Sequence, residues 1–111
     1  MLLEGSCHCG AVRFSLQSRT PRPYMVCYCS ICRKTGSALW VANPHHAESV
    51  YPFASAMDTP LPVPTERDHI MENYRPDWVA VAVAQGDAHF PEYPTVGIHD
   101  WHERRGLLEP E

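Results

Sequence analysis

Residues 7–9, Cys-His-Cys, and residues 27–32, Cys-Tyr-Cys-Ser-Ile-Cys, contain all five cysteines of this 111-residue chain. Their spacing is C-x-C-x17-C-x-C-x2-C. Thiolates two or three positions apart on a turn can converge on one metal ion, about 2.3 Å from each sulfur. The spacing therefore predicts metal ligands, with zinc preferred to an iron–sulfur cluster because zinc is the commoner ion in such closed thiolate sets. The predicted ligands are Cys7, Cys9, Cys27, Cys29 and Cys32.

Two other interpretations of the cysteines are buried free thiols and a redox pair at Cys29 and Cys32. A redox C-x-x-C usually opens a helix within a βαβ unit, and no such alternation surrounds this pair. Complete disulfide pairing is impossible for five cysteines, and their share of the chain lies below the roughly 8–10% of short secreted disulfide scaffolds. Metal binding remains the preferred interpretation.

The charge balance and the apolar runs exclude several classes of protein. The chain has 9 Lys and Arg against 13 Asp and Glu, a formal net charge of −4, which argues against a dedicated binder of nucleic acid or anionic membranes. Its longest apolar run, residues 78–84, is far shorter than the roughly 18–20 residues needed to span a bilayer. Residues 1–5 lack the pattern of a signal peptide. We expect one cytoplasmic domain over residues 1–111, small enough to benefit from a metal staple.

The periodicity of apolar residues predicts a mainly β protein. Residues 12–16 alternate apolar and polar side chains, and residues 24–27 and 38–42 have strand composition. We expect these three strands to form a small antiparallel sheet that carries both cysteine segments. Further strands are expected at 68–71 and 78–83, with an extended proline-rich loop over 44–64 and another loop over 86–94. A short C-terminal helix is expected from Ile98 to Arg105, closed by Gly106.

Two stretches of the chain carry a resemblance to a known family. Residues 5–14, Gly-Ser-Cys-His-Cys-Gly-Ala-Val-Arg-Phe, and residues 27–34, Cys-Tyr-Cys-Ser-Ile-Cys-Arg-Lys, resemble the glutathione-dependent formaldehyde-activating enzyme family, whose domain is shared with centromere protein V. Residues 51–55, 68–71 and 98–102 also look like this family. The resemblance implies a β-tent-like zinc fold with antiparallel sheets. It also implies, as in characterised members, a carbon–sulfur lyase or synthase that joins glutathione and formaldehyde into S-hydroxymethylglutathione.

The resemblance also implies roles for the cysteines. Cys27, Cys29 and Cys32 match the cluster that holds a catalytic zinc through three thiolates. Cys7 and Cys9 match a pair that, in the family, joins a later C-x-x-C to close a structural zinc. That later pair is absent here, and residues 36–40 look like the stretch that normally follows it. We therefore hypothesise that this chain lacks the family's central segment, so that Cys32 is either the last catalytic ligand or the first cysteine of the lost pair.

Five thiolates leave three arrangements open, because a closed zinc site needs four ligands and an open catalytic site needs three. In the first, Cys27, Cys29 and Cys32 form an open site, and Cys7 and Cys9 are free or are completed by His45, His46 or water. In the second, Cys7 and Cys9 join two of the other three in one closed site. In the third, two chains complete the sites together, which makes a homodimer possible.

These arrangements lead to two functional hypotheses. The first is a zinc-dependent carbon–sulfur lyase that acts on a glutathione-type thiol adduct at Cys27, Cys29 and Cys32. Arg33 and Lys34 would then attract the carboxylates of the small-molecule thiol or offset the charge of the thiolates. The alternative is a non-catalytic structural zinc module, or an inactive shortened homologue, with a single four-thiolate site.

Overall fold

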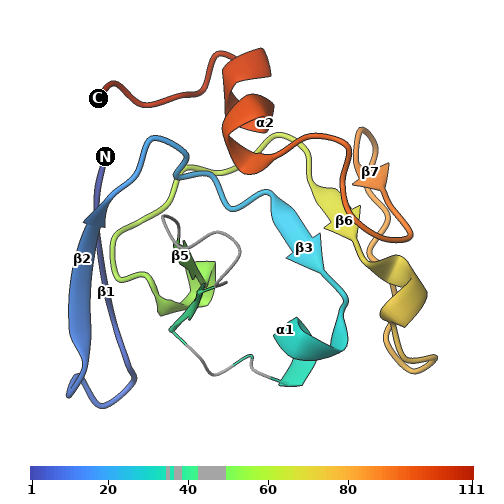
Figure 1. Cartoon of the computed structure of the whole chain (residues 1–111), viewed down its shortest axis with the longest axis horizontal. Helices are drawn as coiled ribbons and strands as arrows, with labels where there is room; N and C mark the ends of the chain where they lie inside the picture. Colours follow the sequence, from blue (N-terminus) through green and yellow to red (C-terminus); the bar gives the residue numbers. More distant parts are fainter. Residues whose placement is uncertain (35, 37–38, 43–49) are drawn as a thin grey trace.

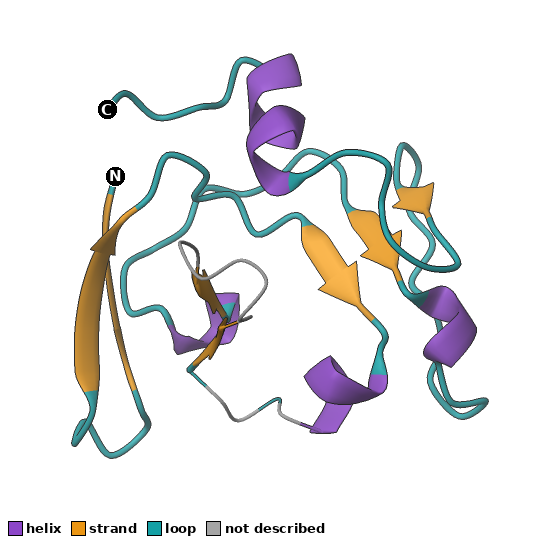
Figure 2. Cartoon of the chain, viewed as in Figure 1, coloured by secondary structure: helices purple, strands orange, loops and turns teal. Residues whose placement is uncertain are grey.

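The computed structural model describes residues 1–34, 36, 39–42 and 50–111. Short strands dominate these residues, and the helices are short (Figures 1 and 2). The strands are β1 (Leu2–Ser6), β2 (Arg13–Gln17), β3 (Met25–Cys27), β4 (Trp40–Ala42), β5 (Val50–Pro52), β6 (Asp68–Ile70) and β7 (Ala88–His89). The helices are α1 (Ser30–Lys34), α2 (Ile98–Arg104) and the 3-10 turns η2 (Ala54–Ala56) and η3 (Glu72–Tyr74). This confirms the prediction of a mainly β fold with antiparallel strands and a short C-terminal helix.

Strands β1 and β2 form an antiparallel hairpin at one side of the molecule (Figure 1). The alternating pattern of β2 turns Phe14 toward the interior, where it faces Gly5 across the hairpin. Phe14 also meets the Trp40 ring edge-on, with centroids 5.3 Å apart, and so joins the hairpin to the antiparallel pair β4–β5.

The third sheet is parallel, with strand order β3-β6-β7. Met25 pairs with Asp68 and Cys27 with Ile70, so the strand that leads into the second cysteine segment lies against a strand from much later in the chain. All three residues of β6 are buried because it is paired on both sides. Cys27, the last residue of β3, is therefore held against the fully buried strand β6.

Helix α2 closes the top of this sheet in Figure 1 by packing aromatic rings. The Trp101 ring stacks on Tyr24 with centroids 3.9 Å apart and an interplanar angle of 11°. The Arg105 guanidinium also lies over the Trp101 ring, with its Cζ atom 4.1 Å from the ring centroid. Gly106 adopts the positive φ of 67° expected of a glycine just beyond a helix end. The helix prediction is confirmed to within one residue.

The predicted grouping of strands is wrong. Strands at 13–17, 25–27 and 40–42 do form, but they belong to three different sheets rather than to one. Strands β1, β5 and β7 were not predicted; β5 lies within the expected 44–64 loop and β7 within the expected 86–94 loop. The predicted strands β2 and β4 pair with the unpredicted strands β1 and β5, whereas β3 pairs with β6, which the sequence did predict at 68–71.

The predicted strand at 78–83 is also wrong. These residues have no strand partner in the described chain, and Trp78 and Val83 are 78% and 85% exposed. The Val79 amide donates to the Pro76 carbonyl, which makes a turn rather than a ladder. The residues of this run cannot pair with β6, because β3 and β7 already pair with it on both sides. Of the tryptophans, only Trp101 is buried, whereas Trp40 remains 44% exposed.

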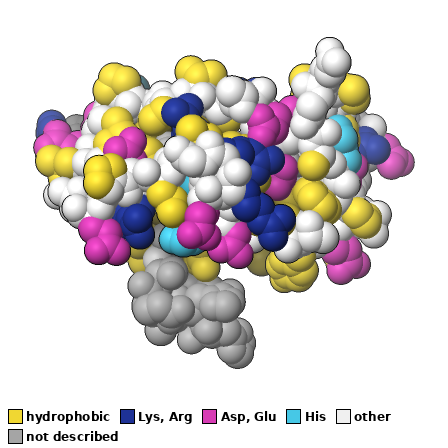
Figure 3. Space-filling view, turned by 90° about the horizontal axis from the view of Figure 1, so that it is seen from above, with side chains coloured by type: hydrophobic (Ala, Val, Ile, Leu, Met, Phe, Trp, Pro, Cys, Tyr) yellow, Lys and Arg dark blue, Asp and Glu magenta, His cyan; other side chains and the backbone are white. Residues whose placement is uncertain are grey.

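The described part of the molecule contains no helix long and apolar enough to cross a membrane. On the face drawn in Figure 3, acidic and basic side chains are intermingled.

Candidate metal centre

Cys27, Cys29 and Cys32 bring their sulfurs together at the junction of β3 and α1. All three Sγ atoms lie within 4.8 Å of one another, and the Cys27 thiol donates to the Cys29 Sγ at 3.2 Å. Two sulfurs bound tetrahedrally at about 2.3 Å from zinc are about 3.8 Å apart. The spacing of these thiols therefore fits one zinc ion with little adjustment.

Local backbone structure explains why the three thiols converge. Strand β3 ends at Cys27, and helix α1 begins directly after Cys29, so the chain turns sharply between them. The Cys32 amide in the first turn of α1 donates to the Cys29 Sγ at 3.4 Å, as it would to an N-cap side chain. The Arg33 amide donates to the Cys29 carbonyl at 3.0 Å. The helix turn thus places Cys32 back over Cys29.

The thiols of this cluster do not ionise alike. Burial raises the pKa of Cys27. Burial, together with hydrogen bonds and charge from Cys27 and Cys29, raises that of Cys32 to about 12. Burial acts the same way on Cys29, but hydrogen bonds from the Cys32 amide and the Cys27 thiol outweigh it and lower the Cys29 pKa. Cys29 is therefore the thiol of this cluster that ionises most readily, and a bound cation would offset the repulsion among three thiolates.

The first cysteine pair forms a separate turn. Cys7 and Cys9 have sulfurs 3.5 Å apart, and the Cys7 Sγ accepts a hydrogen bond from the Val12 amide at 3.3 Å. That hydrogen bond and the one from Cys9 lower the pKa of Cys7 to about 7. Gly10, with a φ of 76°, allows the chain to reverse here. Two sulfurs at this separation can bind one ion, but they supply only half of a tetrahedral set.

The two cysteine segments lie apart. The turn that holds Cys7 and Cys9 is at the tip of the β1–β2 hairpin, whereas α1 lies at the lower edge of the molecule nearer its centre (Figure 1). Among the described residues, the ligand group around Cys27 contains the three thiols alone, without Cys7 or Cys9. The structure therefore brings three of the five predicted ligands together. His45, His46 and Thr35 lie outside the described residues.

Arg33 and Lys34 are exposed in the last turn of α1, immediately beyond the thiol cluster. Within the described residues neither side chain forms an ion pair. A hollow of about 460 Å³ lies elsewhere, beside β1 and β2, and includes no thiol. The cluster at α1, with its neighbouring cations, is the stronger candidate for a site of chemistry.

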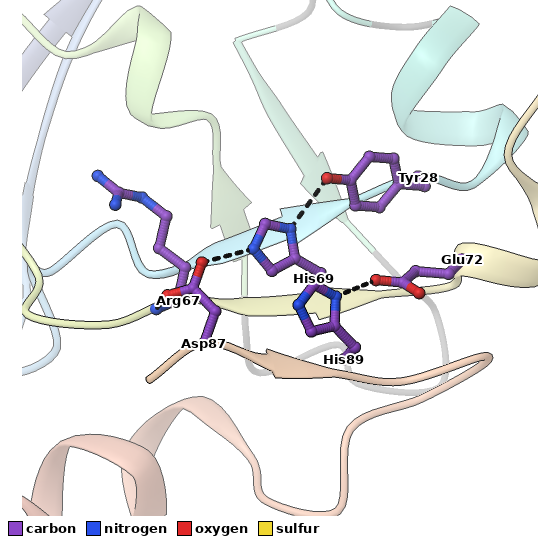
Figure 4. Close-up of polar contacts among 6 residues, drawn as sticks. All are labelled: Tyr28, Arg67, His69, Glu72, Asp87 and His89. Atoms are coloured by element: carbon purple, nitrogen blue, oxygen red, sulfur yellow. Dashed lines mark hydrogen bonds and ion pairs between the residues drawn. The ribbon is translucent and has the colours of Figure 1, made fainter. Parts of the chain in front are cut away.

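A second group of titratable side chains, which the sequence did not reveal as a unit, lies along β6 and β7, next to the end of β3 (Figure 4). His69 on β6 contacts the Tyr28 hydroxyl and the Asp87 carboxylate, and the His89 ring stacks on it. These contacts involve both ring nitrogens of His69. Asp87 stands 18 residues after His69, and only the β6–β7 pairing makes them neighbours.

The sequence comparisons agree with the cysteine pattern. The profile of the glutathione-dependent formaldehyde-activating enzyme family matches residues 2–54, which include all five cysteines. A protein of Halomonas elongata named "Putative glutathione-dependent formaldehyde-activating enzyme" is 40% identical over an alignment that covers 98% of this chain and 99% of that protein. The chain belongs to the glutathione-dependent formaldehyde-activating enzyme family. No solved structure is a significant match to this family member.

The length of that alignment bears on the missing-segment hypothesis. Its 156 positions exceed the 111 residues of this chain by 45, so the Halomonas relative has at least that many internal residues without a counterpart here. An internal deletion of this size is what the hypothesis requires. Within the aligned region this chain is thus shorter than that relative, which agrees with the missing-segment hypothesis.

Proposed function

We propose that this protein is a zinc-dependent carbon–sulfur lyase of the formaldehyde-activating type, acting on a glutathione-like thiol adduct. The observation that carries the proposal is the convergence of Cys27, Cys29 and Cys32 within 4.8 Å, with no fourth Cys, His, Asp or Glu ligand among the described residues. Three protein ligands and one open position are typical of catalytic zinc, whereas structural zinc is closed by four. The family name supports the choice of substrates.

The reaction joins a thiol and formaldehyde reversibly: the sulfur forms a bond to the carbonyl carbon, and the thiol proton passes to the carbonyl oxygen. Zinc, when bound, supplies a positive centre that lowers the pKa of an incoming thiol. Cys27, Cys29 and Cys32 would hold that ion, and their half-buried position limits water around it. Arg33 and Lys34 would attract the carboxylates of a peptide thiol toward the same end of α1.

A comparison of two cysteine variants tests the proposal. We expect about one tightly held zinc per wild-type chain, and faster condensation of glutathione with formaldehyde than in buffer, measured by NMR. Cys29→Ser should lose the zinc and reduce the rate by more than about 100-fold. Substitution of a residue that only supports a metal ligand already lowers metal affinity or activity by about 10–100-fold, and loss of a ligand itself should cost more. Cys9→Ser tests whether the first segment shares this ion.

The structural alternative gives a different result. If Cys9→Ser loses as much zinc as Cys29→Ser, one closed site spans both segments, and a non-catalytic module replaces the proposal. If wild-type protein binds zinc but leaves the rate of condensation unchanged, the substrate assignment fails.

A further inference from the structure

A continuous chain of hydrogen bonds leads from the thiol cluster into the core. The Tyr28 hydroxyl is 2.9 Å from His69 Nδ1, and His69 Nε2 is 2.8 Å from Asp87 Oδ2. The other carboxylate oxygen, Asp87 Oδ1, accepts a hydrogen bond from the Arg67 amide at 2.9 Å. The side chains of His69 and Asp87 are only 2% and 4% exposed (Figure 4).

The Asp87 carboxylate can only accept, which sets the direction of the two hydrogen bonds that it forms. Hydrogen bonds from His69 and from the Arg67 amide lower the pKa of Asp87, so its carboxylate is ionised and accepts from both. In the neutral imidazole the single proton then lies on Nε2, facing Asp87, and Nδ1 is the acceptor. The Tyr28 hydroxyl must then donate to Nδ1. Both nitrogens of the His69 ring have a hydrogen-bond partner in this arrangement.

Tyr28 is the residue between two of the clustered cysteines. The thiols of Cys27 and Cys29 contact each other, whereas the Tyr28 side chain between them reaches His69 on β6. Its amide donates to the Ile70 carbonyl at 3.1 Å, and its hydroxyl donates to His69. Tyr28 is thus bonded to β6 through both its backbone amide and its side-chain hydroxyl.

We propose that Tyr28, His69 and Asp87 are positioning residues that hold Cys27 and Cys29 in the orientation needed to bind zinc. The inference rests on the proposed function in one respect, namely that these thiols are metal ligands. Rotation of residue 28 would move both sulfurs at once, because they flank it. The ionised Asp87 fixes His69, His69 fixes Tyr28, and Tyr28 fixes the direction of the two thiols.

The same histidines do not form a good metal site of their own. His69, Glu72 and His89 have ligand atoms within 4.8 Å of one another. However, the two imidazole rings are stacked, with centroids 4.6 Å apart and an angle of 7° between their planes. A metal lies in the plane of an imidazole that binds it, and in-plane lone pairs of parallel rings do not converge. Both nitrogens of His69 are also occupied. His89 instead bonds Glu72 at 2.5 Å and covers the His69 ring.

The test is Tyr28→Phe, which removes one hydroxyl and keeps the ring. We expect zinc affinity, measured by competition with a chromophoric chelator, to fall roughly tenfold, at the lower end of the effect of outer-shell partners. In the cobalt-substituted protein, the visible and thiolate charge-transfer bands should change in position or intensity because the ligand geometry changes. The matched control is Tyr93→Phe, since Tyr93 is 77% exposed; it should leave both readouts unchanged.

Each outcome decides the inference. If Tyr28→Phe has wild-type zinc affinity and a wild-type cobalt spectrum, Tyr28 does not position the thiols. A lower melting temperature with an unchanged spectrum shows a merely structural role and also overturns the inference. If Tyr28→Phe does not fold, Asp87→Asn decides by the same spectrum, because an amide cannot accept from both His69 and the Arg67 amide. Failure of wild-type protein to bind either metal overturns the proposed function and this inference with it.

Discussion

His102 is the residue that best shows how this small domain uses buried polar groups. Its side chain is fully buried in α2, where Nδ1 donates to the Ile98 carbonyl at 2.9 Å and Nε2 accepts from the Arg22 amide at 3.2 Å. A protonated ring would place an N–H against the N–H of Arg22. Burial, followed by the charges of Arg22, Arg105 and His99, lowers the pKa of His102, although the Ile98 carbonyl acts in the opposite direction.

We therefore expect His102 to make stability depend on pH. Its pKa in the folded protein lies below the ordinary value of about 6.5 in the unfolded chain. As the pH falls through that value, the unfolded chain takes up a proton that the folded protein does not, so the free energy of unfolding decreases. Above that pH the loss is absent. NMR titration of the His102 ring measures the pKa directly, and a value at or above 6.5 would contradict the expectation.

At the scale of elements, the β1–β2 hairpin depends on a residue without a side chain. A Cβ built on Gly5 would lie 2.3 Å from Cζ of Phe14 and 2.7 Å from the backbone oxygen of Ala56. The bridge between Gly5 and Met57 also brings the next segment close on this side. Phe14 can therefore pack over residue 5 and contact Trp40 only because glycine has no side chain there.

Gly5→Ala should destabilise the protein by about 1–3 kcal/mol, the usual cost of overpacking, since one of the clashing atoms is backbone. Gly97→Ala is the matched control: its Cβ meets nothing within 4 Å, and its φ of −73° is accessible to alanine. We expect a loss of only a few tenths of a kcal/mol there. Denaturant unfolding of both variants measures the difference, and equal losses would contradict the close packing of Gly5.

The elements also show what could be predicted from sequence. The alternation at 13–17 marks one face of a strand, and helix α2 carries its own end signal, so local patterns sufficed for both. The partners of the strands are set by contacts between distant residues, and a strand such as β7, with two residues, has no periodicity to detect. The apolar run at 78–83 has strand composition but pairs with no strand in the described part of the chain. Local composition cannot supply that information.

For the candidate site too, one part could be predicted from the sequence and another could not. Cys27, Cys29 and Cys32 were predicted as a group because ligands on one turn are close in sequence. Their convergence in space agrees with the spacing, while their binding of zinc stays a prediction. The link from Tyr28 to Asp87 could not be predicted, because it crosses three strands whose pairing no local pattern indicates.

At the scale of the whole molecule, the core is small. Of the described residues, the buried apolar side chains are Leu3, Tyr24, Ala56, Ile70 and Trp101, and two of the largest buried side chains are histidines. The described strands are divided among three small sheets, and the β4–β5 sheet contributes none of these buried residues. A domain with so little buried apolar surface needs additional stabilisation, which a bound metal can provide.

Removal of metal should therefore have a large effect on stability. We expect excess chelator to lower the melting temperature strongly or to abolish the cooperative transition, and added zinc to restore it, because an ion that binds only the folded state stabilises that state. Calorimetry of wild-type protein before and after chelation measures this. A cooperative melt at the same temperature in chelator would show that the small core is sufficient alone.

The parallel pairing of β3 with β6 has a consequence for protein synthesis. The register joins Met25 to Asp68 and Cys27 to Ile70, residues 43 positions apart. At about 5–20 residues per second, a ribosome needs roughly 2–9 s to make that interval. During those seconds the three cysteines are already part of the nascent chain, but the strand that will hold them does not yet exist. Until it does, the nascent thiols lack the protection of this fold against oxidation or binding to the wrong metal.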